Sequence, residues 1–167
     1  LYATCTVNRD YLGPYNPAVR YTPNLDRFAA RSVVFEKQQT EAGQSGIAYA
    51  SLFTGQQAPQ HGVFEHPTVL TDDLLLIGEA FRNAGYDPHF WARQAMASPE
   101  LNYAQGIPAD NVRWDAEAGE RDTANVLTAD DADFRAILDR LADDSGYRAL
   151  LITNFSQTHA PYSALPV

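Results

Sequence analysis

Three side chains in this sequence have the chemistry of a site that cleaves an ester of an oxyanion: Ser45, Arg93 and His159. A serine can act as the nucleophile. An arginine can stabilise the charge on the equatorial oxygens of a phosphoryl or sulfuryl group. A histidine can donate to an ester oxygen or protonate a leaving alkoxide near neutral pH. Each residue alone has a simpler interpretation, as a helix cap, a surface cation or a loop histidine.

The residues around Ser45 predict that a helix begins there. Residues 40–43 are typical of a loop, and no helix-breaking residue occurs from Ile47 to Phe53. The backbone N–H groups of residues 46–48 would then point out of the helix, where phosphate or sulfate oxygens could bind them. The sequence therefore predicts that Ser45 either caps this helix or presents its hydroxyl to an anion.

Hydrophobic periodicity predicts the other elements. Two more helices are expected over residues 23–31 and 72–84, the second ended by Gly85. A further helix is marked by Thr128 and Asp131 at capping-box spacing, and its apolar stripe consists of Phe134, Ile137, Leu138 and Leu141. Strands are expected over residues 32–35, 86–91 and 148–155, with an irregular segment over residues 95–127.

Helices that alternate with buried strands predict an α/β fold with a mostly parallel central sheet. Ligands of such sheets bind beyond the carboxyl ends of the strands. The loops after Phe35, Trp91 and Phe155 should therefore converge on one site, and these loops carry Ser45, Arg93 and His159.

The composition limits the classes of protein and partner. A chain of 167 residues, 45% of them hydrophobic, is long enough for one core, so residues 1–167 are expected to form one domain or part of a larger one. The net charge of −9 argues against nucleic-acid binding. The single cysteine, Cys5, excludes an internal disulfide and argues against a zinc cluster. No apolar run has the length of a membrane-spanning helix, so a membrane anchor could lie only outside this chain.

Five segments carry recognisable motifs in a fixed order. They are DYLGPY at residues 10–15, YTPNLDRFA at 21–29, SGIAYASLFTG at 45–55 followed by HGV at 61–63, AGY at 84–86 with Arg93, and HAPY at 159–162. Together they resemble the sulfatases of the alkaline phosphatase superfamily. The resemblance implies an α/β sandwich like that of alkaline phosphatase, with this chain as the N-terminal part of the catalytic domain.

The resemblance also implies roles for individual residues. Ser45 becomes the counterpart of the catalytic nucleophile, whose oxygen is also a metal ligand, and Gly46 beside it is expected to help bind the substrate. Arg93 and His159 become counterparts of the lysine and histidine that contact the oxygens of the ester. A divalent metal (Zn, Mn, Mg or Ca) is expected, and Cys5 occupies the position of an acidic metal ligand in the family. A small buried apolar residue is the alternative interpretation of Cys5.

Two departures from the family pattern refine these expectations. Sulfatases have Pro and Arg two and four residues after the nucleophile, which license its conversion to formylglycine, and here those positions hold Ile47 and Tyr49. An unmodified serine favours phosphoryl over sulfuryl chemistry. The Ser-Gly start and the HAPY segment look like the membrane-anchored phosphoglycerol or phosphoethanolamine transferase branch, which implies an extracytoplasmic or membrane-anchored location.

Three hypotheses about function follow. The first is metal-dependent hydrolysis or transfer of a phosphate or sulfate ester, carried by a small molecule, a lipid or a glycan. The second is a catalytically inactive relative or anion-binding module, favoured by Cys5, Ile47 and Tyr49. The third, a serine hydrolase of the α/β-hydrolase class, lacks the required Gly-x-Ser-x-Gly signature. His61 matches a family motif, and we expect a structural role for it because it follows a helix end.

Overall fold

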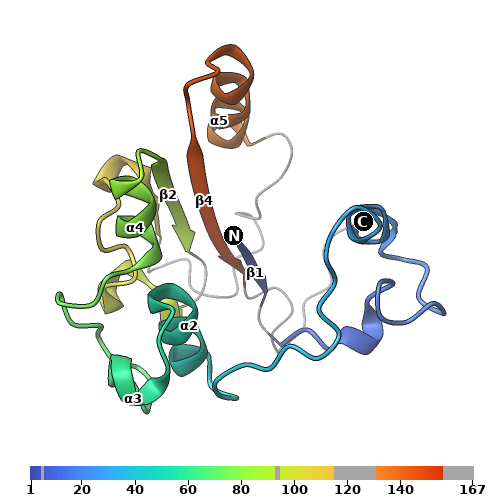
Figure 1. Ribbon diagram of the computed structural model, residues 1–167, viewed down its shortest axis with the longest axis horizontal. Coiled ribbons are helices and arrows are strands. Elements are labelled where there is room, and N and C mark those ends of the chain that lie inside the picture. Colours follow the sequence, from blue (N-terminus) through green and yellow to red (C-terminus); the bar gives the residue numbers. More distant parts are fainter. Residues whose placement is uncertain (5, 93–94, 115–130, 156–167) are drawn as a thin grey trace. The chain divides into compact units, whose positions relative to one another are not determined.

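The computed structural model describes residues 1–4, 6–92, 95–114 and 131–155 (Figure 1). The chain divides into two compact units, one made of residues 1–5 and 41–167 and the other of residues 6–40. Each unit is described by itself below. That residues 1–167 belong to a single domain stays a prediction.

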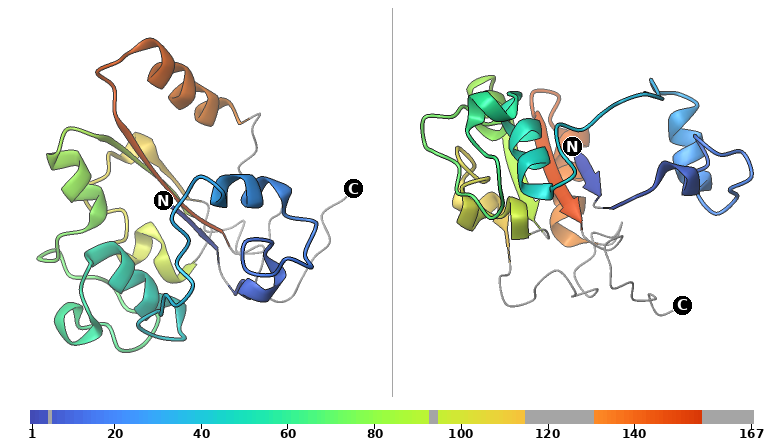
Figure 2. Two further views of the ribbon diagram at one scale, coloured as in Figure 1. Left: turned by 45° about the vertical axis from the view of Figure 1, so that its right-hand side comes forward. Right: turned by 90° about the horizontal axis from the view of Figure 1, so that it is seen from below.

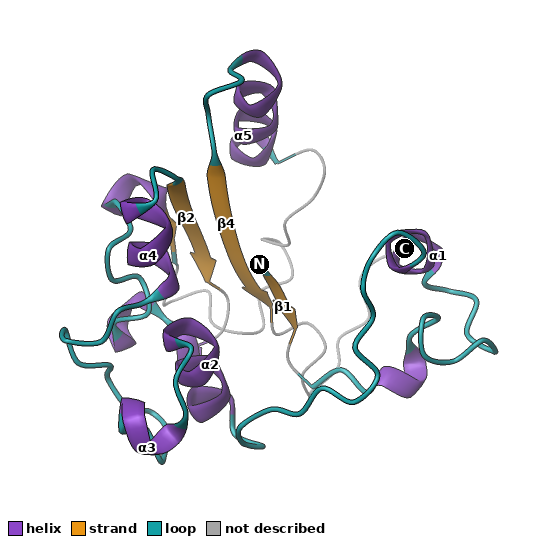
Figure 3. Ribbon diagram, in the orientation of Figure 1, coloured by secondary structure: helices purple, strands orange, loops and turns teal. Residues whose placement is uncertain are grey.

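The larger unit is built on a four-stranded parallel sheet with the strand order β1-β4-β2-β3. Figure 3 shows β4 between β1 and β2. The longest ladder joins β2 to β4, from the pair Asp87 and Ala149 to the pair Ala92 and Asn154. The strands are β1 (Tyr2–Thr4), β2 (Asp87–Ala92), β3 (Val112–Arg113) and β4 (Ala149–Phe155). The parallel α/β sheet and the strands expected over residues 86–91 and 148–155 are therefore confirmed.

Helices cover both faces of this sheet. Successive side chains of β2 point to opposite faces, so its apolar residues can pack against helices on both sides. On one face, Phe90 of β2 meets Phe53 of α2 (Ser45–Thr54) with ring centroids 5.7 Å apart. On the other face, Trp91 meets Phe134 of α5 (Ala132–Asp143) at 6.5 Å. Figure 2 shows α2 and α4 (Ile77–Asn83) on the opposite side of the sheet from α5. The short α3 (Ala58–His61) follows α2.

The hydrophobic core lies between the sheet and α2. Phe53 is its centre, since its ring packs edge to face against Phe90 and against Tyr103, whose centroid is 5.2 Å away. Tyr103 lies after two short 3₁₀ helices that follow β2, namely η2 (Ala95–Ala97) and η3 (Pro99–Leu101), and its side chain belongs to the core. The remaining core residues are Tyr49 and a set of aliphatic side chains: Ile47, Ala50, Val63, Leu70, Leu74, Leu76, Ala92, Ala97, Ile107, Leu150 and Ile152.

The helix expected from the stripe of Phe134 and Ile137 is confirmed as α5, and its start is set by one side chain. The Asp131 carboxylate accepts the N–H groups of Asp133 and Phe134, at 3.1 and 3.0 Å, and so caps the helix. The capping box expected from Thr128 and Asp131 is therefore wrong, because Asp131 itself holds the cap position; Thr128 lies outside the described residues. The predicted stripe is only half covered, because Ile137 is buried whereas Leu138 and Leu141 are 46% and 44% exposed.

The helix expected from residue 72 begins later, at Ile77. The Gln105 side chain binds carbonyl groups that a longer helix would use. Its Nε2 donates to the Leu74 carbonyl at 2.7 Å and to the Asp72 carbonyl at 3.3 Å. Glu79 then accepts the Leu76 N–H at 3.1 Å, which closes the first turn of α4.

The smaller unit confirms one expected element and contradicts another. The helix expected over residues 23–31 is present as α1 (Pro23–Ala29), after the 3₁₀ helix η1 (Arg9–Tyr11). The strand expected over residues 32–35 is wrong, because this segment is irregular and Val33 and Phe35 are 80% and 66% exposed. A strand needs a neighbouring strand for its backbone groups, and a run of apolar residues does not supply one.

Candidate active site

Ser45 is the first residue of α2, and Gln44 holds the cap position. Gln44 has extended dihedral angles (φ −105°, ψ 134°), and its carbonyl accepts the first helical hydrogen bond, from the Ala48 N–H at 3.1 Å. The simpler prediction that Ser45 caps its helix is therefore wrong. The half-buried Ser45 instead belongs to the first turn, whose N–H groups find no acceptors within the helix.

Gly46 fixes the backbone of this first turn from two sides. Its carbonyl accepts the Tyr103 hydroxyl at 2.9 Å, and its N–H donates to Nδ1 of His66 at 3.4 Å. Burial raises the pKa of Tyr103, so its hydroxyl remains a neutral donor. A Cβ added to Gly46 would lie 2.6 Å from the Cβ of His66, which is closer than real side chains approach. The site therefore requires glycine here.

The sheet brings the segment that follows β2 toward this turn. β2 ends at Ala92 and pairs there with Asn154 of β4, so both strands end at the same edge of the sheet. After the end of β2, η2 packs against α2, and Asn154 Nδ2 donates to the Ala97 carbonyl at 3.3 Å. Arg93 and His159 follow these two strands but lie outside the described residues. Their convergence with Ser45 stays a prediction, and the loop after Phe35 does not follow a strand.

The expected metal site has no counterpart among the described residues. Within residues 1–4, 6–92, 95–114 and 131–155, no three His, Cys, Asp or Glu side chains are grouped closely enough to hold a metal ion. Cys5 lies outside these ranges. The roles of Ser45 and Cys5 as metal ligands therefore stay predictions.

His61 is buried at the end of α3 and has a well-defined hydrogen-bonding pattern. Its Nδ1 accepts the Val63 N–H at 3.1 Å, so in the neutral ring the proton is on Nε2, which lies 2.9 Å from the Ser51 hydroxyl oxygen. Burial lowers the pKa of His61, although the Glu41 charge and a backbone hydrogen bond oppose this. Because Nε2 carries the proton, His61 cannot act as a base toward Ser51. These contacts agree with a structural role.

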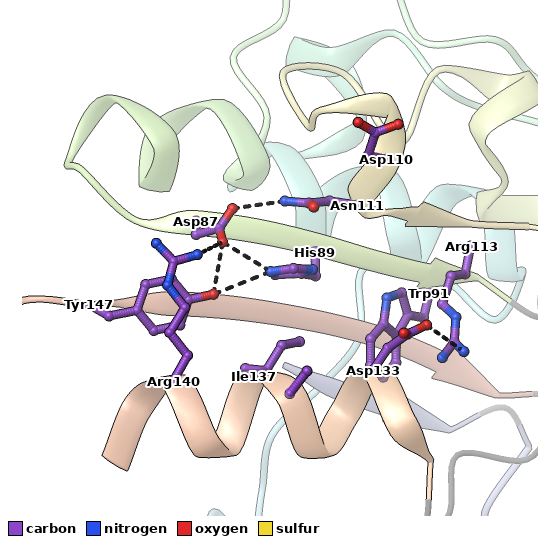
Figure 4. Close-up of a pocket in the computed structure, with 11 residues that line it drawn as sticks. Asp87, His89, Trp91, Asp110, Asn111, Arg113, Asp133, Ile137, Arg140 and Tyr147 are labelled. Carbon is purple, nitrogen blue, oxygen red and sulfur yellow. Dashed lines mark hydrogen bonds and ion pairs between the residues drawn. The ribbon is translucent and has the colours of Figure 1, made fainter. Parts of the chain in front are cut away.

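A separate cavity of about 320 Å³ lies between β2, α5 and the 3₁₀ helix η4 (Ala109–Asn111) (Figure 4). Asp87 is the centre of its hydrogen bonds: one carboxylate oxygen accepts Asn111 Nδ2 at 2.8 Å, and the other accepts the Tyr147 hydroxyl at 2.8 Å. The second oxygen also lies 3.3 Å from His89 Nε2 and 3.5 Å from Arg140. Nothing in the sequence pattern indicated this cluster, since its members come from four separate segments.

The contacts of Asp87 favour its ionised form. Burial opposes ionisation of Asp87, but the hydrogen bonds from Tyr147 and Asn111 and the nearby His89 outweigh it and lower the pKa of the carboxyl. Burial and the hydrogen bond to Asp87 raise the pKa of Tyr147 to about 12. The Arg140 guanidinium lies 3.8 Å from the centre of the Tyr147 ring. The cluster ties α5 and the turn after it to the sheet.

Comparison with known families decides the assignment. The sulfatase family model matches residues 6–166, nearly the whole chain. This chain belongs to the sulfatase family. Enzymes of this family generally use a divalent metal ion. The family assignment predicted from the five motifs is therefore confirmed, and the sheet is consistent with part of an alkaline-phosphatase-like fold.

Two relatives match parts of this sulfatase chain. The multifunctional alkaline phosphatase superfamily protein PehA of Trinickia caryophylli is 37% identical over 67 residues, which are 40% of this chain and 13% of PehA. An endo-4-O-sulfatase of Bacteroides thetaiotaomicron is 30% identical over 106 residues, which are 58% of this chain and 21% of that enzyme. The chain thus spans about a fifth or less of the length of these relatives. No solved structure matches it significantly.

The two departures from the sulfatase pattern lie in the core. Ile47 and Tyr49, at the positions of the family's Pro and Arg, are 9% and 7% exposed. Tyr49 packs edge to face against Phe53 with ring centroids 6.3 Å apart. Their side chains therefore contribute to packing, and neither supplies the charge that an arginine would bring to the site. None of the described helices is long and apolar enough to cross a bilayer.

Proposed function

We propose that this protein cleaves or transfers phosphate or sulfate esters, with Ser45 as the nucleophile. The observation that carries the proposal is the position of Ser45 as the first residue of the ten-residue helix α2, within the family's nucleophile motif. Backbone N–H groups and the positive end of the helix dipole favour an anion at this terminus. The names of the two relatives, an alkaline phosphatase superfamily protein and a sulfatase, support the same class of ester.

The proposed reaction has two steps. The Ser45 oxygen forms a bond to phosphorus or sulfur while the bond to the ester oxygen breaks, and the alcohol leaves with a proton. Water or a second alcohol then takes the group from Ser45. Arg93 and His159 are proposed to hold the equatorial oxygens and to protonate the leaving oxygen. A divalent metal would increase the acidity of the serine hydroxyl and neutralise the transferred group.

Phosphate is the favoured ester. With Ile47 and Tyr49 in the core, the segment lacks the Pro and Arg that direct conversion of the nucleophile to formylglycine in sulfatases. An unmodified serine suits phosphoryl transfer. The same two residues support a second candidate, an inactive relative that retains an anion-binding helix terminus. Membrane anchoring and an extracytoplasmic location stay predictions.

Turnover of aryl esters tests the proposal. The full-length protein, supplied in turn with Zn²⁺, Mn²⁺, Mg²⁺ or Ca²⁺, should hydrolyse an aryl phosphate faster than an aryl sulfate. Ser45→Ala should abolish this activity. Ser51→Ala, in the same helix but bonded to His61, is the matched control and should retain it. No turnover with any of these ions, or equal turnover by Ser45→Ala, would favour the inactive relative.

A further inference from the structure

His66 supplies a hydrogen-bond acceptor to α2 from outside the helix. The Gln44 side chain makes no capping hydrogen bond, although Gln44 occupies the cap position. Instead Nδ1 of His66, twenty residues further along the chain than Gly46, accepts the Gly46 N–H at 3.4 Å. The side chain of His66 also packs directly on the Cα of Gly46, where any Cβ would be too close. His66 therefore accepts one of the backbone N–H groups at the start of α2, which is then not available to another acceptor.

Gly46 cannot easily turn its N–H toward another acceptor. Gly46 is buried, and its carbonyl is held by the hydroxyl of Tyr103, a side chain that is only 1% exposed. His66, in contrast, belongs to the exposed segment between α3 and Leu70. An anion that uses the Gly46 N–H must therefore displace the imidazole, because one N–H group makes one good hydrogen bond at a time. His66, as the exposed member of the pair, is the group that an anion would displace.

We propose that His66 is a displaceable cap that competes with the anionic group of the substrate for the Gly46 N–H. The cap lowers the affinity of the site for every anion that binds there, and so His66 sets the affinity of the nucleophile segment for its ester. This inference rests on the proposed function, since it concerns the same helix terminus. An anion that binds the Gly46 N–H must first break its hydrogen bond to His66. The exchange of one hydrogen bond corresponds to about a 2- to 10-fold change in affinity.

Binding of inorganic phosphate to the full-length protein tests the cap without any need for turnover. The titration is made calorimetrically at about pH 8, where an ordinary histidine is neutral. His66→Ala should bind phosphate about 2- to 10-fold more tightly than the unchanged protein. His66→Asn should bind like the unchanged protein, because the amide oxygen can accept the Gly46 N–H where Nδ1 did. Far-UV circular dichroism verifies that both variants are folded.

The amide resonance of Gly46 in a nitrogen-15 spectrum locates the effect. Phosphate should shift this resonance in the unchanged protein, and the same shift should occur at lower phosphate concentrations in His66→Ala. Equal or weaker phosphate binding by His66→Ala would overturn the cap, as would the absence of binding in all three proteins. If His66→Ala misfolds, His66→Gln replaces it, because its amide oxygen lies one methylene beyond the position of Nδ1. His66→Gln should then bind phosphate more tightly than His66→Asn, and equal or weaker binding would overturn the cap.

These outcomes are distinct from failure of the proposed function. Tighter phosphate binding by His66→Ala without any Ser45-dependent ester turnover would support the cap and contradict the enzyme. Ser45-dependent turnover with unchanged phosphate affinity in His66→Ala would support the enzyme and overturn the cap.

Discussion

At the scale of single residues, Gly46 is required by the side chain packed on it. Alanine in a helix is usually more stable than glycine by about 1 kcal/mol. Here the added Cβ would meet the Cβ of His66, so we expect Gly46→Ala to lower the free energy of unfolding by about 1 to 3 kcal/mol. Gly43→Ala is the matched control, because a Cβ there has no neighbour within 4 Å, and it should change stability by less than about 0.5 kcal/mol. Urea denaturation measures both, and equal stability of the two variants would contradict the packing at Gly46.

His61 gives the protein a pH dependence of stability with a defined sign. Because burial lowers the pKa of His61 in the folded state, the unfolded chain binds a proton first as the pH falls. Stability from the neutral side chain is thus fully present above the ordinary histidine pKa of about 6.5 and is lost below it, as the pH falls toward the folded pKa. His61→Gln should reduce this pH dependence between about pH 7 and 5. The free energy of unfolding measured across that range checks it.

An unchanged slope in His61→Gln would contradict the assignment of His61 as the buried histidine that stays neutral in the folded protein. The motif around His61 allowed a structural role to be predicted from sequence, whereas no spacing singled out His66.

At the scale of the elements, α5 is held to the sheet by polar contacts at both of its ends. Arg113 of β3 binds Asp131 and Asp133 at 3.1 and 2.8 Å near the start of the helix, and Asp87 of β2 contacts Arg140 near its end. Since Asp87 accepts several hydrogen bonds as an anion, Asp87→Asn should destabilise the protein by about 1 to 2 kcal/mol at neutral pH. Asp139→Asn, at an exposed position of the same helix, should change stability by less than about 0.5 kcal/mol.

The Asp87 contribution should also depend on pH. Its pKa is lowered in the folded state, so the stabilisation is present above the ordinary aspartate pKa of about 3.9 and disappears as the pH falls through the folded pKa. The difference in unfolding free energy between the unchanged protein and Asp87→Asn should therefore shrink in acid. Chemical denaturation at a series of pH values measures it, and a difference that grows in acid would contradict the assigned protonation state.

The elements that could be predicted are those whose signal is local. The alternation around Phe90 and the apolar run of β4 mark buried strands, and the stripe of Ile137 marks a helix, because burial periodicity is a property of one segment. The start of α4 was missed because the side chain of the distant Gln105 binds the carbonyl groups of Asp72 and Leu74. The cavity at Asp87 was missed for the same kind of reason, since only the folded topology brings β2, η4 and α5 together.

At the scale of the whole molecule, the two units differ in how they are stabilised. The larger unit has a continuous core around Phe53, as its sheet and aromatic contacts indicate. Among residues 6–40, all of which the structure describes, Val19 is the one buried hydrophobic residue. Large apolar side chains of this unit are exposed: Tyr11, Tyr21, Phe28, Val33 and Phe35. The family motifs here thus identify ancestry, and they do not by themselves specify a stable unit.

Local hydrogen bonds give the smaller unit its shape. The Gly13 N–H donates to the Thr22 hydroxyl at 2.8 Å, and Asn16 Nδ2 donates to the Asp10 carbonyl at 2.7 Å. The carboxylate of Asp26 packs on Gly13, where no Cβ would fit. These contacts link the two motifs of residues 10–15 and 21–29 and explain why glycine occurs at position 13.

A synthetic peptide of residues 6–40 should therefore have no cooperative fold. Ordering its backbone costs roughly 1 to 2 kcal/mol per residue, and a segment of this size with one buried side chain cannot recover that by hydrophobic burial. Its far-UV circular dichroism should be that of an unfolded chain, with a gradual thermal response. Joined to the rest of the protein, the same segment should become protected from amide exchange at Gly13, whose N–H is hydrogen-bonded. A sigmoidal melt of the isolated peptide would show that Gly13, Thr22 and Asp26 suffice to stabilise the unit without a hydrophobic core.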